Sequence, residues 1–221
     1  TSFAEIDAAR ALHIDVVVTD HHEVLDSRVP DAAAVVNAHQ DDCGYPFKHL
    51  AGVGVAYKLV KALFHGTEHV ADGYLDLVSL GTVADVVPLV GENRFITTSG
   101  LGELNKRGRI GLAALMEVAG LKDKDISSSH IGFALGPRIN AMGRVGSPRK
   151  ALDLLLADDM SVARELAKML DAENRSRQKI EGAILDQALS KVEREVNFKH
   201  HRVIVLASEG WHPGVIGIVA S

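Results

Sequence analysis

Cysteine and long apolar runs are both scarce in this sequence. Its one cysteine, Cys43, can form neither an internal disulfide nor a cysteine-based zinc site, and no activating base stands beside it to make a thiol nucleophile. A chain without disulfides is typical of a reducing compartment, so we expect a cytoplasmic protein. No apolar run approaches the ~18 residues that a membrane-spanning helix needs, and we expect no membrane partner.

Positive charge and aromatic side chains are also in short supply. Lysine and arginine number 24 against 29 aspartates and glutamates, a formal net charge of −5, so any nucleic-acid-binding surface must be local. Aromatic residues make up only 5% of the chain, whereas glycine occurs 20 times. That balance favours an α/β protein with many tight turns between strands and helices over a β-sandwich.

Both ends of the sequence lack the features of natural domain termini. The chain begins at Thr1 rather than at a methionine, and it stops at Ser221 inside an apolar stretch. Domain ends rarely fall in such a place. We therefore expect an internal fragment of a longer protein.

The first half of the sequence alternates between helix-like and strand-like patterns. An amphipathic segment over residues 3–13 precedes an apolar, β-branched run over 14–18, which predicts a buried parallel strand. The strand pattern ends abruptly in a polar cluster, the position at which α/β proteins bind ligands. We also expect a short strand over 35–37 and helices over 52–64, 71–80 and 110–119.

One long helix dominates the second half of the sequence. A serine and a proline at 147–148 are typical of a helix start, and a further helical pattern covers 161–196. About 35 residues at ~1.5 Å each would span roughly 50 Å. Because the stretch 169–180 is polar, we expect a connector between domains. Residues 203–206 then predict the first strand of a second α/β domain.

Asp20, His21 and His22 follow the first expected strand. A carboxylate and an imidazole together suit a borderline divalent ion such as Mn²⁺. Neighbouring residues on an extended backbone point to opposite sides, so the two histidines should not both bind one ion unless a turn reorients them. One division assigns the metal to His21 and the substrate phosphate to His22. A solvated polar loop is the alternative.

Asp85 stands between apolar neighbours, in the run Val83-Ala84-Asp85-Val86-Val87. An unpaired carboxylate is costly to bury, so a metal ion, an arginine or a helix N-terminus must compensate it. The first of these makes Asp85 a candidate metal ligand. The alternative is structural: Asp85 would cap the N-terminus of a following turn.

A basic segment over residues 136–144 carries Arg138, Asn140 and Arg144. Guanidinium groups match phosphate oxygens bidentately, Asn140 adds a neutral donor, and the glycines let the backbone approach a ligand. No acidic residue occurs from 126 to 152, so we expect a locally positive segment. The alternative is a solvated basic loop that pairs with acids elsewhere.

Trp211 and His212 belong to a short motif after the last expected strand. Trp211 could stack on a nucleic-acid base, and His212 could contact a phosphate. A packed turn at the start of a domain is the alternative for both residues.

In order and spacing, these segments resemble the RecJ-type exonucleases of the DHH phosphoesterase superfamily. The D-H-H strand end marks the superfamily, and two later segments point to the RecJ type within it. The resemblance covers essentially the whole chain. Its matching segments are 16–22, 50–56, 80–89, 134–144 and 211–221.

The resemblance implies a fold and a division into three parts. Residues 1–147 would form a DHH-type α/β domain, with a parallel sheet and flanking helices but without its N-terminal part. Residues 148–198 would form a long helical connector. Residues 199–221 would begin a second α/β domain, truncated here, of the kind that binds nucleic acid in this family.

The resemblance also implies roles for the residues described above. His21 and Asp85 would be metal ligands, whereas Asp20 and His22 would be catalytic, with His22 at the scissile phosphate. The residues that would hold nucleic acid are Arg138, Asn140, Arg144, Trp211 and His212.

The implied activity is 5′-to-3′ hydrolysis of single-stranded DNA in recombination and repair. Two divalent ions, Mn²⁺ or Mg²⁺, would activate water and stabilise charge on the phosphate. The family's first acidic motif, the aspartate of its second motif and a later glycine-rich motif are absent from these 221 residues. We therefore expect an incomplete two-metal site and a fragment that is inactive alone. The expected partners are single-stranded DNA and a helicase or single-strand-binding protein.

Two other functions stay open. A DHH phosphoesterase for short oligonucleotides, cyclic dinucleotides or pyrophosphate needs less DNA-tracking surface, whereas the long connector and the basic window favour a polymer. A non-catalytic relative that binds DNA or a replication partner would have lost its metal-binding carboxylates. Asp20, His21 and Asp85 are all present, which favours an enzyme.

Overall fold

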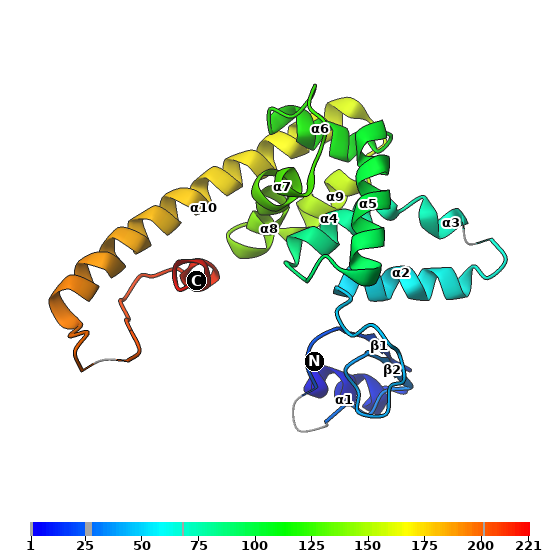
Figure 1. The fold of residues 1–221 in the computed structure, drawn as a ribbon, viewed down its shortest axis with the longest axis horizontal. Helices are drawn as coiled ribbons and strands as arrows, with labels where there is room; N and C mark the ends of the chain where they lie inside the picture. Colours follow the sequence, from blue (N-terminus) through cyan, green and yellow to red (C-terminus); the bar gives the residue numbers. More distant parts are fainter. Residues whose placement is uncertain (1, 25–27, 68, 201) are drawn as a thin grey trace. The chain divides into compact units, whose positions relative to one another are not determined.

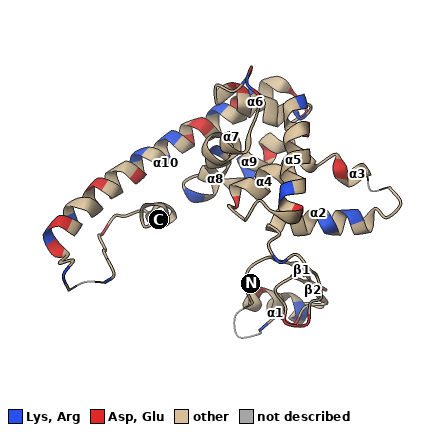
Figure 2. Ribbon diagram, in the orientation of Figure 1, with Lys and Arg blue, Asp and Glu red and all other residues tan. Residues whose placement is uncertain are grey.

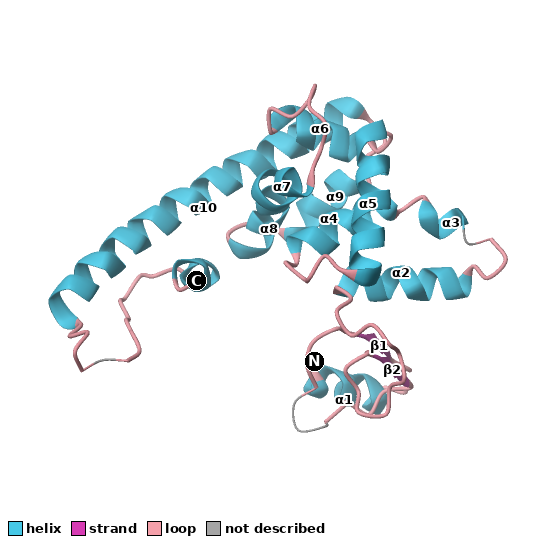
Figure 3. Cartoon of the chain, in the orientation of Figure 1, coloured by secondary structure: helices cyan, strands magenta, loops and turns pink. Residues whose placement is uncertain are grey.

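The computed structural model describes residues 2–24, 28–67, 69–200 and 202–221. Over these residues the chain is mainly helical and contains one small parallel sheet (Figure 3). No helix among them combines the length and the apolarity needed to cross a membrane. Figure 1 labels the helices and strands along the chain. The chain divides into two compact units. The first comprises residues 1–108 and 125–136, and the second comprises 109–124 and 137–221.

The sheet of the first unit consists of β1 (Val17–Thr19) and β2 (Ala34–Val36), which follow the helix α1 (Phe3–Ala11). The strands are parallel, and Val17, Val18 and Thr19 lie opposite Ala34, Val35 and Val36. Both expected strands are therefore present and parallel, although β1 is shorter than the apolar run and begins later. The expected burial of β1 is wrong, because Val17 is 57% exposed and a sheet of two strands covers little of either one. Because parallel strands end at the same edge of a sheet, the residues after β1 and β2 meet there. The backbone N–H of Asp20 donates to the carbonyl oxygen of Val36 at 3.0 Å.

Helices make up most of the rest of the first unit, and α4 (Leu75–Ala84) packs against three of them. Its neighbours are α2 (Gly52–Leu63), α5 (Gly91–Lys106) and the π-helix η2 (Ile131–Leu135). Two short helices are α3 (His69–Asp72) and α7 (Ser128–His130). The close approach of α4 and α5 requires Gly100, because a Cβ there would lie 2.3 Å from the carbonyl oxygen of Leu75.

An apolar core holds α4 in place. The buried side chains of this core come from α2 to α5 and from the segment before α2: Leu50, Val55, Tyr57, Ala71, Leu75, Val78 and Ile96. Burial of such side chains is the main favourable term in folding. It therefore fixes the position of the residue that follows the C-terminus of α4, which is Asp85.

The helix predictions for the first unit are confirmed in part. The helix expected over 52–64 is α2. The helix expected over 71–80 is interrupted between α3 and α4, and α4 continues past Gly81 to Ala84. The sequence pattern does not predict α5, because three glycines and two threonines weaken its helical signal.

In the second unit, α10 (Met160–Glu195) packs against three other helices: α6 (Ile110–Val118), α9 (Pro148–Leu155) and α11 (Pro213–Val219). The helix α8 (Gly136–Arg144) leads towards α9. The helices expected over 110–119 and 161–196 are confirmed. Asp159 starts α10, because its Oδ1 accepts from the backbone N–H groups of Ser161 and Val162, both at 2.9 Å. Charges of both signs alternate along α10 (Figure 2).

Two features of the second unit differ from the sequence-based interpretation. Residues 136–144 are helical, so the alternative of a solvated loop is wrong. They follow η2 without a break, and Pro137 therefore lies inside a helical run, directly after a π-helical segment. Residues 203–206 form no strand, because no partner strand lies beside them in the part of the chain that the structure describes. The polar middle of α10 also includes three buried residues on one face, which are Asp171, Asn174 and Arg177.

Candidate active site

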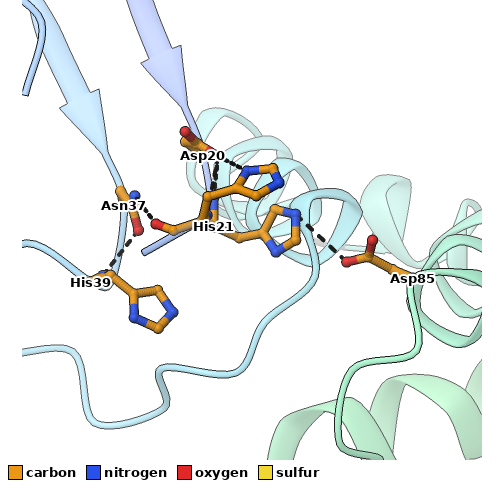
Figure 4. A network of polar contacts seen from close by, with 6 residues as sticks. Asp20, His21, Asn37, His39 and Asp85 are labelled. Atoms are coloured by element: carbon orange, nitrogen blue, oxygen red, sulfur yellow. Dashed lines mark hydrogen bonds and ion pairs between the residues drawn. The ribbon is translucent and has the colours of Figure 1, made fainter. Parts of the chain in front are cut away.

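Asp20 and His21 follow the carboxyl end of β1 (Figure 4). A tight turn brings His22 against Asp20 as well. Oδ1 of Asp20 accepts hydrogen bonds from the backbone N–H groups of His21 at 2.7 Å and His22 at 3.2 Å. The same oxygen lies 2.7 Å from Nδ1 of His22. Asp20 therefore both folds the turn and orients the His22 ring.

The turn reorients the two histidines relative to an extended backbone, the condition that the sequence analysis left open. Their ring centroids are only 4.4 Å apart, with the planes inclined by 45°. The rings nevertheless have different partners. His22 contacts Asp20 and is 78% exposed, whereas His21 faces Asp85 and is mostly buried. One ring is therefore held within the protein, and the other is accessible to a substrate.

His21 and Asp85 form the second half of the site. Nε2 of His21 lies 3.6 Å from Oδ2 of Asp85 (Figure 4). Asp85 is the C-cap residue of α4, so the alternative in which it caps the N-terminus of a following turn is wrong. Gly52, the first residue of α2, leaves room for the His21 ring, because a Cβ there would lie 3.2 Å from Cδ2 of His21. Three separate segments thus fix one imidazole–carboxylate pair.

The His21–Asp85 pair has the chemistry of part of a divalent-metal site. Imidazole nitrogen and carboxylate oxygen both suit Mn²⁺. Two ligands ~2.1 Å from one small divalent ion stand roughly 3 to 3.5 Å apart, close to the observed separation. The described ranges contain no cluster of three or more His, Cys, Asp or Glu able to hold a metal ion. The pair therefore fits such an ion but supplies two donors rather than a full coordination shell.

Asn37, directly after β2, is a site residue that the sequence analysis does not identify. Its buried side chain donates through Nδ2 to the carbonyl oxygen of His22 at 2.9 Å, and its Oδ1 accepts from the backbone N–H of His39 at 2.9 Å. It thereby ties the end of β2 to the turn after β1 (Figure 4). A polar residue at the end of the second expected strand is the signal that points to it.

A cavity of about 280 Å³ adjoins the turn. Asp20, His22 and Asn37 line it, together with Phe3 and Arg28. The guanidinium carbon of Arg28 lies 5.4 Å from the centroid of the Phe3 ring, within the range of a cation–π contact. The cavity therefore places a positive charge on the same side of the turn as the exposed His22 ring.

In the second unit, the basic segment is tied into the fold. Nε of Arg138 donates to Oδ1 of Asp171 at 2.9 Å, and Nη2 of Arg175 lies 2.8 Å from the other carboxylate oxygen. Arg138 and Asp171 are both largely buried. The acid that pairs with Arg138 comes from α10, outside the acid-free window of the sequence. The absence of acids nearby in the chain therefore does not describe the surroundings of this arginine.

Arg144 and the turn before α11 lie together in the second unit. Nη1 of Arg144 donates to the carbonyl oxygen of Gly214 at 3.0 Å. A Cβ on Gly214 would lie 2.7 Å from the carbonyl oxygen of Arg144, so only glycine fits there. Nδ1 of His212 accepts from the backbone N–H of Gly214 at 3.1 Å and caps α11.

Trp211 and Asn140 complete the set expected to contact nucleic acid. Nε1 of Trp211 donates to Oε1 of Gln187 on α10 at 2.8 Å, and the ring is half-buried. Asn140 is exposed on α8. The contacts of Trp211 and His212 are those of a packed turn, and nucleic-acid contact by the whole set stays a prediction.

Comparison with known proteins places this site in a family. A profile described as "DHH family, N-terminal domain" matches residues 1–82, which include the turn at Asp20 and α2. The single-stranded-DNA-specific exonuclease RecJ of Bacillus subtilis is 43% identical to the chain over 217 residues, which is 98% of this chain and 27% of that protein. The chain belongs to the DHH family.

Other RecJ proteins are similar to this DHH-family chain in sequence and in structure. RecJ of Escherichia coli is 41% identical, with 100% of this chain and 41% of that protein covered. The crystal structure of RecJ in complex with Mn²⁺ from Thermus thermophilus matches with a TM-score of 0.81 and 35% identity, covering 100% of this chain and 32% of that one. The crystal structure of an exonuclease RecJ bound to manganese matches with a TM-score of 0.80 and 34% identity. The match covers 99% of this chain and 54% of that one.

These similarities confirm the expected family and the α/β fold of this DHH-family chain. The chain spans only part of the length of these curated relatives, 27% of the Bacillus subtilis protein and 41% of the Escherichia coli protein. The RecJ crystal structures hold Mn²⁺, as their descriptions state. The roles of individual residues and the three-part division of the chain stay predictions.

Proposed function

We propose that this DHH-family chain carries part of the active site of a metal-dependent exonuclease, which hydrolyses single-stranded DNA in the 5′-to-3′ direction during recombination and repair. The His21–Asp85 pair, held 3.6 Å apart beside an Asp20-oriented His22, is the observation that carries the proposal. The names of the RecJ relatives support the choice of substrate. We propose a cytoplasmic location on the same basis.

His21 and Asp85 are the residues that would hold Mn²⁺ or Mg²⁺. When bound, a divalent ion supplies Lewis-acid polarisation of a phosphate oxygen and activation of water, and a pair of ions clamps both sides of the displacement. An ion that takes about six ligands needs more than these two donors. We therefore propose that further ligands lie outside the described residues and that the 221-residue chain alone is inactive.

His22 acts on the substrate in this proposal, and Asp20 directs it. The Nδ1–H of His22 donates to Asp20, which leaves Nε2 of the exposed ring for a phosphate oxygen. Hydrogen bonding or proton transfer from this nitrogen would stabilise charge that develops on the phosphoryl group. Asn37 keeps the backbone of His22 in register with the end of β2.

The proposal divides the chain into a DHH domain over 1–147, a connector over 148–198 and the start of a nucleic-acid-binding domain over 199–221. Within it, Arg138, Asn140, Arg144, Trp211 and His212 contact the DNA. The exposure of Asn140 and Arg144 supports that role for these two residues. A helicase or single-strand-binding protein is the proposed partner.

One observation favours a second candidate function. Arg138 is bonded to the buried Asp171, so less of the basic segment is available for a long phosphate backbone than its composition indicates. A DHH phosphoesterase for short oligonucleotides, cyclic dinucleotides or pyrophosphate would need only the metal site and a small cavity such as that beside His22.

The test compares substrates in the full-length gene product that contains this sequence. With Mn²⁺, we expect processive release of nucleotides from single-stranded DNA with a free 5′ end, and little release from duplexes or from 5′-blocked strands. His21→Ala should abolish release, whereas His39→Ala should retain it, because His39 pairs with Glu23 rather than with Asp85. Faster cleavage of dinucleotides or pyrophosphate than of a long single strand would support the second candidate instead.

A further inference from the structure

Val86, the residue after Asp85, has a backbone conformation that valine rarely adopts. Its φ is +59°, in the left-handed region, where a β-branched side chain is a genuine outlier. The other described non-glycine residues with positive φ are His13 and Arg107, neither of which is β-branched. The strain at Val86 is therefore the most pronounced of the three.

Packing of the side chain does not explain this conformation. Val86 is 87% exposed, so its side chain gains little from contacts with the rest of the protein. It occupies the position just after the C-cap of α4, where glycine is the usual residue because it lacks a Cβ. A glycine would satisfy the local backbone without strain, so neither packing nor the turn itself requires a valine here.

The surrounding structure holds the turn at both ends. On the helix side, the N–H of Asp85 donates to the carbonyl of Gly81 at 3.0 Å, and the N–H of Val86 donates to that of Val83 at 3.2 Å. On the other side, Pro88 disfavours a helical conformation for the residue before it, Val87. The chain leaves the helix at Val86 through a left-handed turn.

A buried side chain anchors the far end of the same turn. Nδ2 of Asn93 donates to the carbonyl oxygen of Pro88 at 3.0 Å and to that of His49 at 2.5 Å, and Asn93 is completely buried. Strained residues persist where the surroundings over-determine them, and they gather at functional sites.

We propose that Val86 is a positioning residue, which holds the Asp85 carboxylate towards His21 at a cost to the stability of the fold. The direction of the Asp85 side chain depends on the two peptide planes that flank its Cα. The helix fixes the first plane, and Val86 restricts the second, since a β-branched residue has few conformations within the left-handed region. A glycine at this position would leave the second plane free to turn. That this restriction serves to fix a metal ligand rests on the proposed function.

The experiment replaces Val86 in the full-length gene product and measures three quantities without relying on turnover. For Val86→Gly we expect the melting temperature of the metal-free protein to rise by about 2–4 °C. We expect hydrogen exchange at the amides of residues 85 and 86 to become faster, which reports local opening separately from global stability. We expect the Mn²⁺ dissociation constant, from counting free ion by electron paramagnetic resonance, to rise by roughly tenfold.

Two further variants separate positioning from simple strain. Val86→Thr keeps the β-branched shape at an exposed position, so exchange and Mn²⁺ affinity should stay near the wild-type values. His13→Gly removes a left-handed residue that lies before β1 and is not a proposed metal ligand, so the melting temperature should rise with no change in Mn²⁺ affinity.

Each result bears on the inference. If Val86→Gly lowers the melting temperature, Val86 does not store strain. If exchange at residues 85 and 86 is unchanged, Val86 does not restrain Asp85. If exchange quickens but Mn²⁺ affinity matches the wild type, the restraint does not serve a metal ligand. Absence of Mn²⁺ binding by the wild type would instead contradict the proposed function, while the exchange result would still decide whether Val86 restrains Asp85.

Discussion

The turn after β1 and the basic segment of α8 both present clusters of polar residues in the sequence, but the protein uses them differently. In the turn, Asp20 organises the backbone while His22 stays open to solvent and His21 faces Asp85. In α8, by contrast, Arg138 is bonded to a buried carboxylate from another helix. A polar cluster at the end of a parallel strand predicts a site, because parallel strands end at the same edge of the sheet and bring their polar residues together there. A cluster of like charges does not predict a charged surface, because distant residues can pair with it.

The largest effect that would sharpen this contrast is expected at Asp85. In the full-length gene product, Asp85→Asn keeps the size of the side chain but removes its charge, so turnover should fall by about 10²–10³-fold, or roughly 3–4 kcal/mol. The free energy of unfolding should change by less than ~0.5 kcal/mol, because the side chain is half-exposed. Nucleotide release and urea unfolding measure the two quantities.

A matched control for Asp85 lies in the same unit. Asp72 pairs with Tyr57 and Lys61 away from the site, so Asp72→Asn should leave turnover unchanged. Near-normal turnover of Asp85→Asn at saturating Mn²⁺, with only a lower melting temperature, would make Asp85 a structural residue.

The next effect concerns the buried pair in the second unit. Arg138→Ala removes the buried partner of Asp171 and leaves its ion pair with the exposed Arg175. The free energy of unfolding should therefore fall by about 2–4 kcal/mol. Replacing both partners, Arg138→Met with Asp171→Leu, should recover most of that loss. Chemical denaturation checks both changes.

An exposed ion pair provides the comparison for Arg138. Arg164 contacts Glu117 at 3.1 Å at the surface of the second unit, and Arg164→Ala should cost less than ~1 kcal/mol. If Arg138→Ala proves as mild as Arg164→Ala, Arg138 is not committed to the fold and the contrast between the two regions disappears.

A smaller effect is expected from Asn37, which joins the two strand ends. Asn37→Asp keeps the acceptor for His39 but loses the donor to the carbonyl of His22, which should cost about 1–2 kcal/mol of stability. Loss of this bond lets the turn that carries His22 shift, so we expect a larger effect on kcat than on KM. Steady-state kinetics on single-stranded DNA measure this split.

Asn105 is the matched control for Asn37. It bonds both the backbone N–H and the carbonyl of Ile126, a clamp of the same kind elsewhere in the first unit. Asn105→Asp should lower stability by a similar amount without changing kcat. Equal kinetic losses in the two variants would show that the Asn37 bonds serve folding alone.

The salt dependence of DNA binding tests what remains of the basic segment. Arg144 is exposed, so Arg144→Ala should flatten the slope of log affinity against log salt by about 0.7 for a single strand, the contribution of one neutralised phosphate. Titrations at several salt concentrations, with a metal that blocks cleavage, give the slope. An unchanged slope, with equal losses of activity on DNA and on a minimal phosphodiester, would favour the small-substrate hydrolase.

The smallest expected effect is a pH dependence outside both regions. Burial acts to raise the pKa of the Glu92 carboxyl. The hydrogen bonds from Lys58 and Tyr45 and the charge of Lys58 together outweigh burial, so the pKa of Glu92 lies below its ordinary value of 4.5. A lowered carboxyl pKa adds stability above the unfolded-state value, and this stability is lost as the pH falls through the folded-state value. Unfolding from pH 6 down to pH 3 should therefore show a loss of less than ~1 kcal/mol that Glu92→Gln does not show. Identical pH profiles for the two proteins would rule out this linkage.

Local patterns account for much of the fold. The helical period predicts α2, α6 and α10 to within about one or two residues, and β-branched runs predict both strands. These features depend on neighbouring residues, so a single sequence is enough to find them. The segment 203–206 has the same kind of pattern but forms no strand, because a strand needs a partner that is not beside it in the described chain.

The candidate site depends on both levels. Asp20, His21 and His22 are recognisable from their place after a strand, and their type indicates metal and phosphate chemistry. The pairing of His21 with Asp85, the clamp from Asn37 and the capture of Arg138 by Asp171 all join residues far apart in the chain. Only packing of the helices and the sheet brings those atoms within bonding distance. The left-handed turn at Val86 also involves distant residues, because the buried Asn93 bonds the carbonyl of Pro88 just beyond it.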